Sequence, residues 1–197
     1  MGYYLFIAVL WLSCSLVSRA QTTYELPATK EALEKSRAVL YDCVGIKEVG
    51  GNNRGKDIDR ILSPLGLRGV AWCQALQYYC FYVTGEAIPI KKTAGSQDCF
   101  NDAKKRGKPL PYQIRIDALL FWRVINGWQG HSARVVKVMK MGWVETIEGN
   151  TGNGNQRDGD GVYRKKRHLY NPVGGVKGKR LDSVQNITFC RCNLRIE

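Results

Sequence analysis

Residues 130–150 read GHSARVVKVMKMGWVETIEGN, and this stretch decides the fold class. Two runs rich in β-branched and aromatic residues, 132–138 and 143–147, lie on either side of a short turn at Lys140-Met141. Runs of this kind around a turn of two residues are typical of a β-hairpin. The stretch therefore predicts an antiparallel pair of strands in the second half of the chain.

The register of this hairpin determines which side chains share a face. A two-residue turn places Val138 opposite Trp143, and counting outward from that pair places His131 opposite Asn150. Directly opposed side chains have Cβ atoms about 5 Å apart. Glu148, two residues before Asn150, points to the same face. The count thus groups an imidazole, an amide and a carboxylate, although a single bulge would shift the register.

The first half of the chain has helical rather than strand-like periodicity. Apolar residues at helical spacing predict helices over 30–45, 58–66 and 70–83, each closed by or near a glycine. Helices followed by strands indicate an α+β fold, with N-terminal helices packed on an antiparallel β-sheet. The remaining expectations are a linker at 21–28, mostly loop with one short helix over 91–111, and further strands at 118–124 and 184–192.

Cys73 is the candidate nucleophile. It lies in residues 69–76, GVAWCQAL, where a loop leads into the aromatic helix, so its sulfur is expected near a helix N-terminus. Unpaired amides there favour thiolate over thiol and can hydrogen-bond a tetrahedral oxyanion. Cys80 lies two turns further along, about 10 Å down the axis, and is expected to be a core thiol. With the groups on the hairpin, Cys73 has what thiol acyl transfer requires: a base and a group that orients the base.

Two other motifs have plainer interpretations. His168 ends the basic run Arg164–His168, which is expected to be a solvated face rather than a catalytic element. Residues 158–161, DGDG, are reminiscent of a calcium loop but lack its remaining ligand positions. We expect the segment 149–161 to form a long hairpin turn.

Seven cysteines occur in the chain, and six remain after removal of an N-terminal signal that contains Cys14. An exported protein can keep disulfides, and any disulfides are expected from Cys43, Cys99, Cys190 and Cys192. The closely spaced pair, Cys190 and Cys192, lacks the C-x-x-C spacing of a zinc site. No metal or other cofactor is therefore expected.

The N-terminus is typical of a secretory signal. Residues 3–12 form an apolar run too short to span a bilayer, and residues 18–20 supply small side chains before a cleavage site near Ala20. An uncleaved interfacial anchor and lipidation at Cys14 are the alternatives. No later segment is apolar enough for a membrane span, so we expect a secreted or periplasmic protein, monomeric after signal-peptide cleavage.

The charge balance limits the partners. Lys and Arg number 30 against 17 Asp and Glu, and loss of Arg19 with the signal lowers the formal charge from +13 to +12. A chain this basic is attracted to polyanions. Export argues against nucleic acid, which leaves anionic lipid and the anionic polymers of a cell envelope. A generally solvated basic surface is the alternative to a dedicated binding patch.

Five short motifs follow one another along the chain: EVGGNNRG at 48–55, AWC at 71–73, DALLFW at 117–122, GH at 130–131 and TIEGNT at 146–151. Together, in this order, they resemble the CHAP domain, the cysteine- and histidine-dependent amidohydrolase/peptidase family within the papain-like amidase fold. Two features depart from the family pattern. Gln74 stands where a small residue usually follows the cysteine, and residues 132–134, SAR, are more polar than usual.

The resemblance implies roles for four residues. Cys73 would be the nucleophile and His131 its base, with Glu148 and Asn150 as the acidic and amide residues that accompany them. The implied activity is that of a secreted cysteine peptidase or N-acetylmuramoyl-L-alanine amidase that cleaves peptide or amide bonds of peptidoglycan. A catalytically silent, basic cell-envelope-binding protein on the same fold is the alternative, and an effector delivered to competing cells is another.

The resemblance also implies a domain layout. A CHAP-like catalytic domain is expected at residues 48–168. It would be preceded by the signal at 1–20 and by a linker and helix at 21–47. A strand-like extension that carries the Cys190/Cys192 pair would follow at 169–197.

Overall fold

The computed structural model of the chain describes residues 22–123, 130–152, 159–169 and 185–191. Within these ranges, four α-helices and a seven-stranded sheet form a mixed fold, which confirms the expected α+β class. The helices are α1 (Lys30–Asp42), α2 (Lys56–Leu62), α3 (Cys73–Tyr82) and α4 (Ser96–Arg106), with a 3₁₀ turn η1 (Ser63–Leu65) after α2. None of the described helices is long and apolar enough to cross a membrane. The expected signal at residues 1–20 lies outside the described residues.

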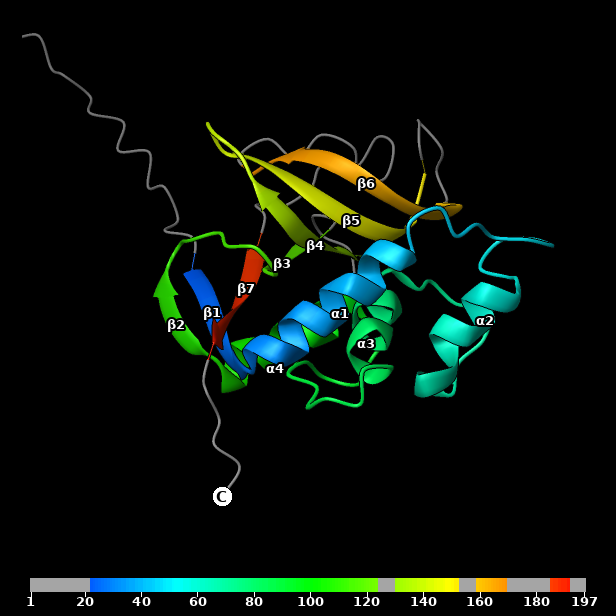
Figure 1. Cartoon of the computed structure of the whole chain (residues 1–197), viewed down its shortest axis with the longest axis horizontal. Coiled ribbons are helices and arrows are strands. Elements are labelled where there is room, and N and C mark those ends of the chain that lie inside the picture. Colours follow the sequence, from blue (N-terminus) through cyan, green and yellow to red (C-terminus); the bar gives the residue numbers. More distant parts are fainter. Residues whose placement is uncertain (1–21, 124–129, 153–158, 170–184, 192–197) are drawn as a thin grey trace, which may run out of the picture.

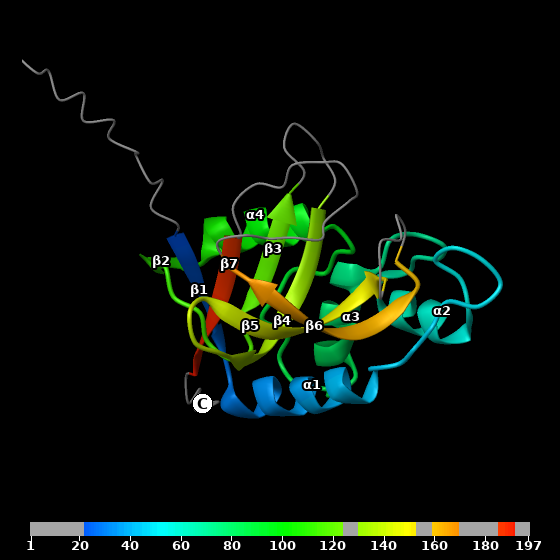
Figure 2. The same cartoon turned by 90° about the horizontal axis from the view of Figure 1, so that it is seen from above.

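The strands form one sheet in the order β2-β1-β7-β3-β4-β5-β6. Strands β1 and β7 pair in parallel, and every other neighbouring pair is antiparallel. The strands are β1 (Thr22–Ala28), β2 (Lys108–Pro111), β3 (Leu119–Arg123), β4 (Gly130–Val138), β5 (Trp143–Thr151), β6 (Gly161–His168) and β7 (Gln185–Arg191). Figure 1 shows α1, α3 and α4 along one side of this sheet, and Figure 2 shows α2 at the end of the molecule remote from β1 and β2.

The two faces of the sheet are both buried over β3. Leu119 and Phe121 pack with helix residues such as Phe81 in the core between α3, α4 and the strands. Leu120 and Trp122 point to the opposite face, where they pack against other strand residues. This alternation follows from the period of two along a strand. A central strand covered on both faces fixes the position of its neighbour β4, which carries His131.

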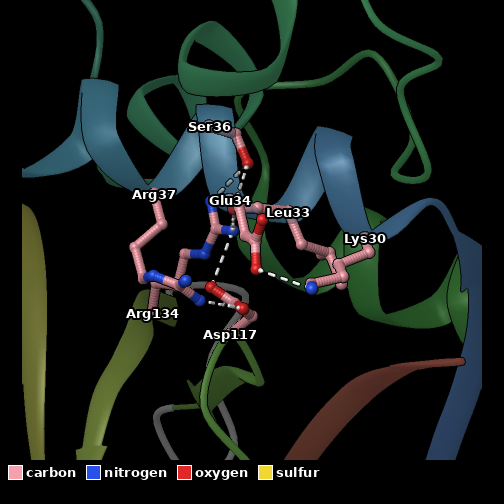
Figure 3. A network of polar contacts seen from close by, with 7 residues as sticks. All are labelled: Lys30, Leu33, Glu34, Ser36, Arg37, Asp117 and Arg134. Carbon is pink, nitrogen blue, oxygen red and sulfur yellow. Dashed lines mark hydrogen bonds and ion pairs between the residues drawn. The ribbon is translucent and has the colours of Figure 1, made fainter. Parts of the chain in front are cut away.

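A buried ionic network ties α1 to the sheet (Figure 3). The guanidinium of Arg134, which is fully buried, donates to the Ser36 hydroxyl at 3.0 Å, to the Leu33 carbonyl at 3.0 Å and to the Asp117 carboxylate at 2.9 Å. Arg37 of α1 also contacts the Asp117 carboxylate. Arg134 therefore holds α1 against β4 and lies in the core.

Several sequence-based expectations differ from the structure. The expected linker at 21–28 is wrong over 22–28, because these residues form β1. The expectation of mostly loop with one short helix over 91–111 is correct in the helix, α4, but it lacks the edge strand β2 and understates the regular structure. The segment from 169 onward was expected to be an extension of the domain. Its described strand, β7, instead lies between β1 and β3 inside the sheet. The basic run 164–168 belongs to the edge strand β6.

Prolines and basic residues explain why both edge strands are poorly marked in the sequence. Pro109 and Pro111 lack the amide that an inner strand would need, and β2 lies at one edge of the sheet. At the other edge, β6 carries the basic run, and charged side chains on an edge strand oppose pairing with other chains. Both strands are therefore polar segments without an alternating apolar pattern.

Candidate active site

The hairpin of β4 and β5 reaches the expected inner register by a different route. At its tip, Val138 pairs with Val144, not with Trp143 as expected, because the turn is longer than two residues. A bulge between Val135 and Lys137 then absorbs one residue of β4. Beyond the bulge the pairing is Val135 with Thr146, which is the expected register. Two local irregularities cancel, so His131 and Glu148 come to the same region of the sheet.

Cys73 is the first residue of α3, where the sequence placed it. The helix begins after Trp72, which is fully buried and donates from its indole Nε1 to the Glu48 carboxylate at 2.8 Å. The residues just before Trp72 are exposed, whereas the Cys73 residue is only 6% exposed. The first amides of a helix lack intrahelical acceptors, so the Cys73 sulfur lies at the positive end of α3.

His131 lies between this thiol and Glu148. Its Nε2 is 3.0 Å from Glu148 Oε2, and the ring also interacts electrostatically with the Cys73 thiol. Because Nε2 faces the carboxylate, Nδ1 is the nitrogen left for the sulfur. The ring stacks at a tilt on Trp122 of β3, with 5.6 Å between centroids. The imidazole is therefore held on three sides, while a quarter of its side chain stays exposed.

The Glu148 carboxylate is fully buried and, besides its contact with the ring, accepts three hydrogen bonds from two side chains. Arg167 of β6 donates from Nε at 2.7 Å and from a terminal nitrogen at 2.6 Å, one to each oxygen. The Thr146 hydroxyl donates to Oε1 at 2.6 Å. These contacts satisfy a charge that burial alone would make very costly.

Arg167 and Thr146 are site residues that the sequence reasoning missed. Arg167 was interpreted as part of a solvated basic run. Its position in β6, two strands from His131, depends on a pairing between β5 and β6 that includes an irregularity after Glu148. The signal in the sequence was the alternation of Tyr163, Lys165 and Arg167, which places all three on one face of a strand.

Asn150 is placed differently from Glu148. It has a positive φ of 51° at the irregular end of β5, and its side chain makes no hydrogen bond with any described residue. Of the two residues expected beside His131, the structure brings the carboxylate into contact with the ring.

The three central groups shift one another's pKa values. Burial opposes ionisation of Cys73, but its interaction with His131, together with the nearby Ser132 backbone, outweighs burial, so the pKa of Cys73 lies below its ordinary value. Burial also opposes protonation of His131, yet its contacts with Cys73 and Glu148 raise its pKa to about 9. Arg167 and then His131 outweigh burial at Glu148 and hold the pKa of that carboxyl far below its usual range. At neutral pH these shifts favour a thiolate, an imidazolium and a carboxylate.

Two glycines next to the site residues are required by close packing. A Cβ on Gly149 would lie 2.7 Å from both Trp72 and Leu76, so β5 can approach the start of α3 only with glycine at this position. A Cβ on Gly130 would lie 2.6 Å from the Ser96 hydroxyl oxygen at the start of α4. The glycines thus set the distance of both strands from the helices.

The other cysteines and His168 do not join this group. Cys43, Cys80 and Cys99 are buried free thiols, so the structure does not support the disulfides expected at Cys43 and Cys99. The side chains of Cys190 and Cys192 lie outside the described part of the chain. His168 contacts the Met141 carbonyl through Nε2 at 3.1 Å, at the hairpin tip.

The described residues contain no cluster of side chains suited to a metal ion. No group of three His, Cys, Asp or Glu side chains that could hold a metal ion occurs within the described ranges. The DGDG motif falls partly outside these ranges, because residues 153–158 are not described.

In comparisons with known proteins, no protein-family model, curated protein or solved structure matches the chain.

Proposed function

We propose that this chain is a secreted cysteine-dependent hydrolase of peptide or amide bonds, with Cys73 as nucleophile, His131 as base and Glu148 as the residue that orients the base. The observation that carries the proposal is the 3.0 Å contact between His131 Nε2 and Glu148 Oε2, made by a ring that also interacts electrostatically with the Cys73 thiol. A thiol at a helix N-terminus, an imidazole and an orienting carboxylate are the groups that thiol acyl transfer uses.

In the proposed reaction, the Cys73 thiolate attacks the carbonyl carbon of the substrate. The Cys73 backbone amide, in the first turn of α3, donates to the oxyanion. The His131 imidazolium then gives its proton to the leaving amine as the tetrahedral intermediate collapses to a thioester. Water, deprotonated by the now neutral imidazole, hydrolyses the thioester and restores the thiolate.

Peptidoglycan is the proposed substrate. The support is the resemblance of the five ordered motifs to the CHAP domain, together with the apparent secretory signal and the basic charge of the chain. A basic protein is attracted to the anionic polymers of a cell envelope, which would raise its concentration at the wall.

The test compares wall hydrolysis by the wild-type chain and two cysteine variants. Cys73→Ala is expected to abolish release of fragments from purified peptidoglycan, because the nucleophile is gone. Cys80→Ala is the matched control, since Cys80 lies on the same helix, is fully buried and is remote from the helix N-terminus. Mass spectrometry of the released fragments identifies the bond that is cut. Retained hydrolysis by Cys73→Ala would refute the proposal.

A catalytically silent envelope-binding protein is the second candidate, favoured by the formal charge of +12 that remains after loss of Arg19 with the signal. Alkylation separates the two. An activated Cys73 reacts with iodoacetamide at mildly acidic pH, where an ordinary thiol is protonated. Equal rates for Cys73 and a model thiol would favour the silent protein.

A further inference from the structure

Arg167 occupies a position that the proposed reaction does not by itself require. It comes from the edge strand β6, yet only 12% of its side chain is exposed, and its guanidinium makes one hydrogen bond to each oxygen of Glu148. We propose that Arg167 is a positioning residue, which fixes the Glu148 carboxylate in the ionised form and in the orientation that His131 requires. This inference rests on the proposed function, because it concerns the same Cys73–His131 pair.

The geometry accounts for an arginine at this position. The planar guanidinium offers two parallel N–H donors, one from Nε and one from a terminal nitrogen, that match the two oxygens of a carboxylate. Held in this fork, the carboxylate cannot rotate about its last bond without losing a contact. Its Oε2 therefore stays directed at His131 Nε2. A lysine at 167 would supply the charge from a single nitrogen and leave the carboxylate free to turn.

The same guanidinium also lies over the Trp122 ring, at 5.6 Å from its centroid. Trp122 in turn stacks against His131. Arg167 thus contacts both of the groups that orient the imidazole, the carboxylate and the aromatic ring. Neither contact brings Arg167 to the reacting sulfur, so its effect on Cys73 is transmitted through these two neighbours.

The positive charge of Arg167 next to Glu148 explains why residue 167 affects the ionisation of Cys73. A fully buried carboxyl favours the neutral acid, and a neutral Glu148 would no longer support the imidazolium. The charged groups that face this carboxylate are His131 from β4 and Arg167 and Lys165 from β6, with the Cys73 thiolate beyond His131. Lys165 contacts the Gly152 carbonyl, not the carboxylate. Loss of Arg167 removes one of the two positive charges in contact with Glu148 and leaves only the His131 imidazolium, so the Cys73 thiolate then forms at a higher pH.

The experiment measures the alkylation rate of Cys73 by iodoacetamide against pH in the full chain, with peptide mapping to separate Cys73 from the other thiols. Arg167→Met is expected to move the acidic limb of this profile to higher pH by about one pH unit. Arg167→Lys is expected to move it in the same direction by less, because the charge remains but the fork is lost. Lys165→Met is the matched control: it removes one positive charge from the same face of β6 and is expected to move the limb by less than either Arg167 variant.

The outcomes are distinguishable. A wild-type Cys73 with an ordinary thiol profile overturns the proposed function and the inference together. An activated wild-type Cys73 whose acidic limb is unmoved in the Arg167 variants overturns the inference alone. A shift in Lys165→Met as large as that in Arg167→Met also overturns it, because it would show a diffuse charge effect. If Arg167→Met does not fold, by circular dichroism, the comparison of Arg167→Lys with Lys165→Met decides.

Discussion

At the scale of single residues, Glu148 is the most densely hydrogen-bonded side chain in the candidate site. Its buried carboxylate accepts from Arg167, Thr146 and the ring of His131. Asn150, by contrast, makes no side-chain hydrogen bond with any described residue and has a positive φ, which glycine adopts without strain. From the sequence, either Glu148 or Asn150 could orient the imidazole. In the structure, only Glu148 has the hydrogen bonds that this role requires.

The difference in hydrogen bonding between Glu148 and Asn150 leads to the first prediction. Glu148→Gln keeps the shape of the side chain but removes the charge that supports the His131 imidazolium. We expect the alkylation rate of Cys73 at pH 6 to fall by at least about tenfold, equivalent to ~1.4 kcal/mol. Asn150→Gly is expected to keep the rate within about twofold of wild type. A larger loss in Asn150→Gly than in Glu148→Gln would reverse the assignment of the orienting residue.

The pKa shifts predict that two assays diverge at alkaline pH. The pKa of Cys73 is lowered and that of His131 is raised to about 9, so the thiolate and the imidazolium coexist between these two values. Hydrolysis needs the imidazolium to protonate the leaving amine, so its rate is expected to fall as pH rises through about 9. Alkylation needs only the thiolate and is not expected to fall there. Parallel decline of both rates above pH 9 would contradict this account.

At the scale of helices and strands, the sequence predicted the helix that carries Cys73 and the strand that carries His131, because both have strong local periodicity. It did not predict the longer hairpin turn or the bulge between Val135 and Lys137, since neither has a distinctive composition. The expected register inside the hairpin was correct because these two errors cancel. The contact of Arg167 with Glu148 could not be predicted, because β6 is an edge strand whose four consecutive basic residues, 164–167, are typical of a solvated segment.

The buried network in Figure 3 allows a prediction at this scale. Asp117 is 2% exposed and is the counter-charge for Arg134 and Arg37. Asp117→Asn leaves a buried guanidinium without its partner, so we expect the free energy of unfolding to drop by about 3 kcal/mol. Glu34→Gln is the control, because Glu34 lies on α1, the helix that the network holds against the sheet. Its ion pair with Lys30 is exposed at 3.8 Å, and its removal should cost less than about 0.5 kcal/mol. Chemical denaturation of both variants measures the difference, and equal losses would contradict the structural role of the network.

At the scale of the whole molecule, β1 and β7 bring the two ends of the described chain together as neighbouring inner strands of one sheet. Residues 23–28 pair in parallel with residues 186–191. Such a pairing between distant segments leaves no local pattern in the sequence, and Pro27 argues against a strand. Pro27 is tolerated because β2 pairs only as far as Glu25, so β1 has an open edge there. The linker and the extension expected on either side of residues 48–168 are therefore parts of the same folding unit.

The position of β7 leads to a prediction about truncation. A chain that ends at His168 lacks the strand between β1 and β3, including Ile187 and Phe189, which are 0% and 4% exposed. Burial of two such side chains contributes roughly 3–6 kcal/mol. This is comparable to the entire stability of many domains, about 5–15 kcal/mol. We therefore expect this chain not to fold, as judged by loss of a cooperative thermal transition and of selective Cys73 alkylation. A chain that ends at Arg191 keeps every described strand and is expected to retain both. A folded, reactive chain ending at His168 would show instead that residues up to His168 suffice for the domain.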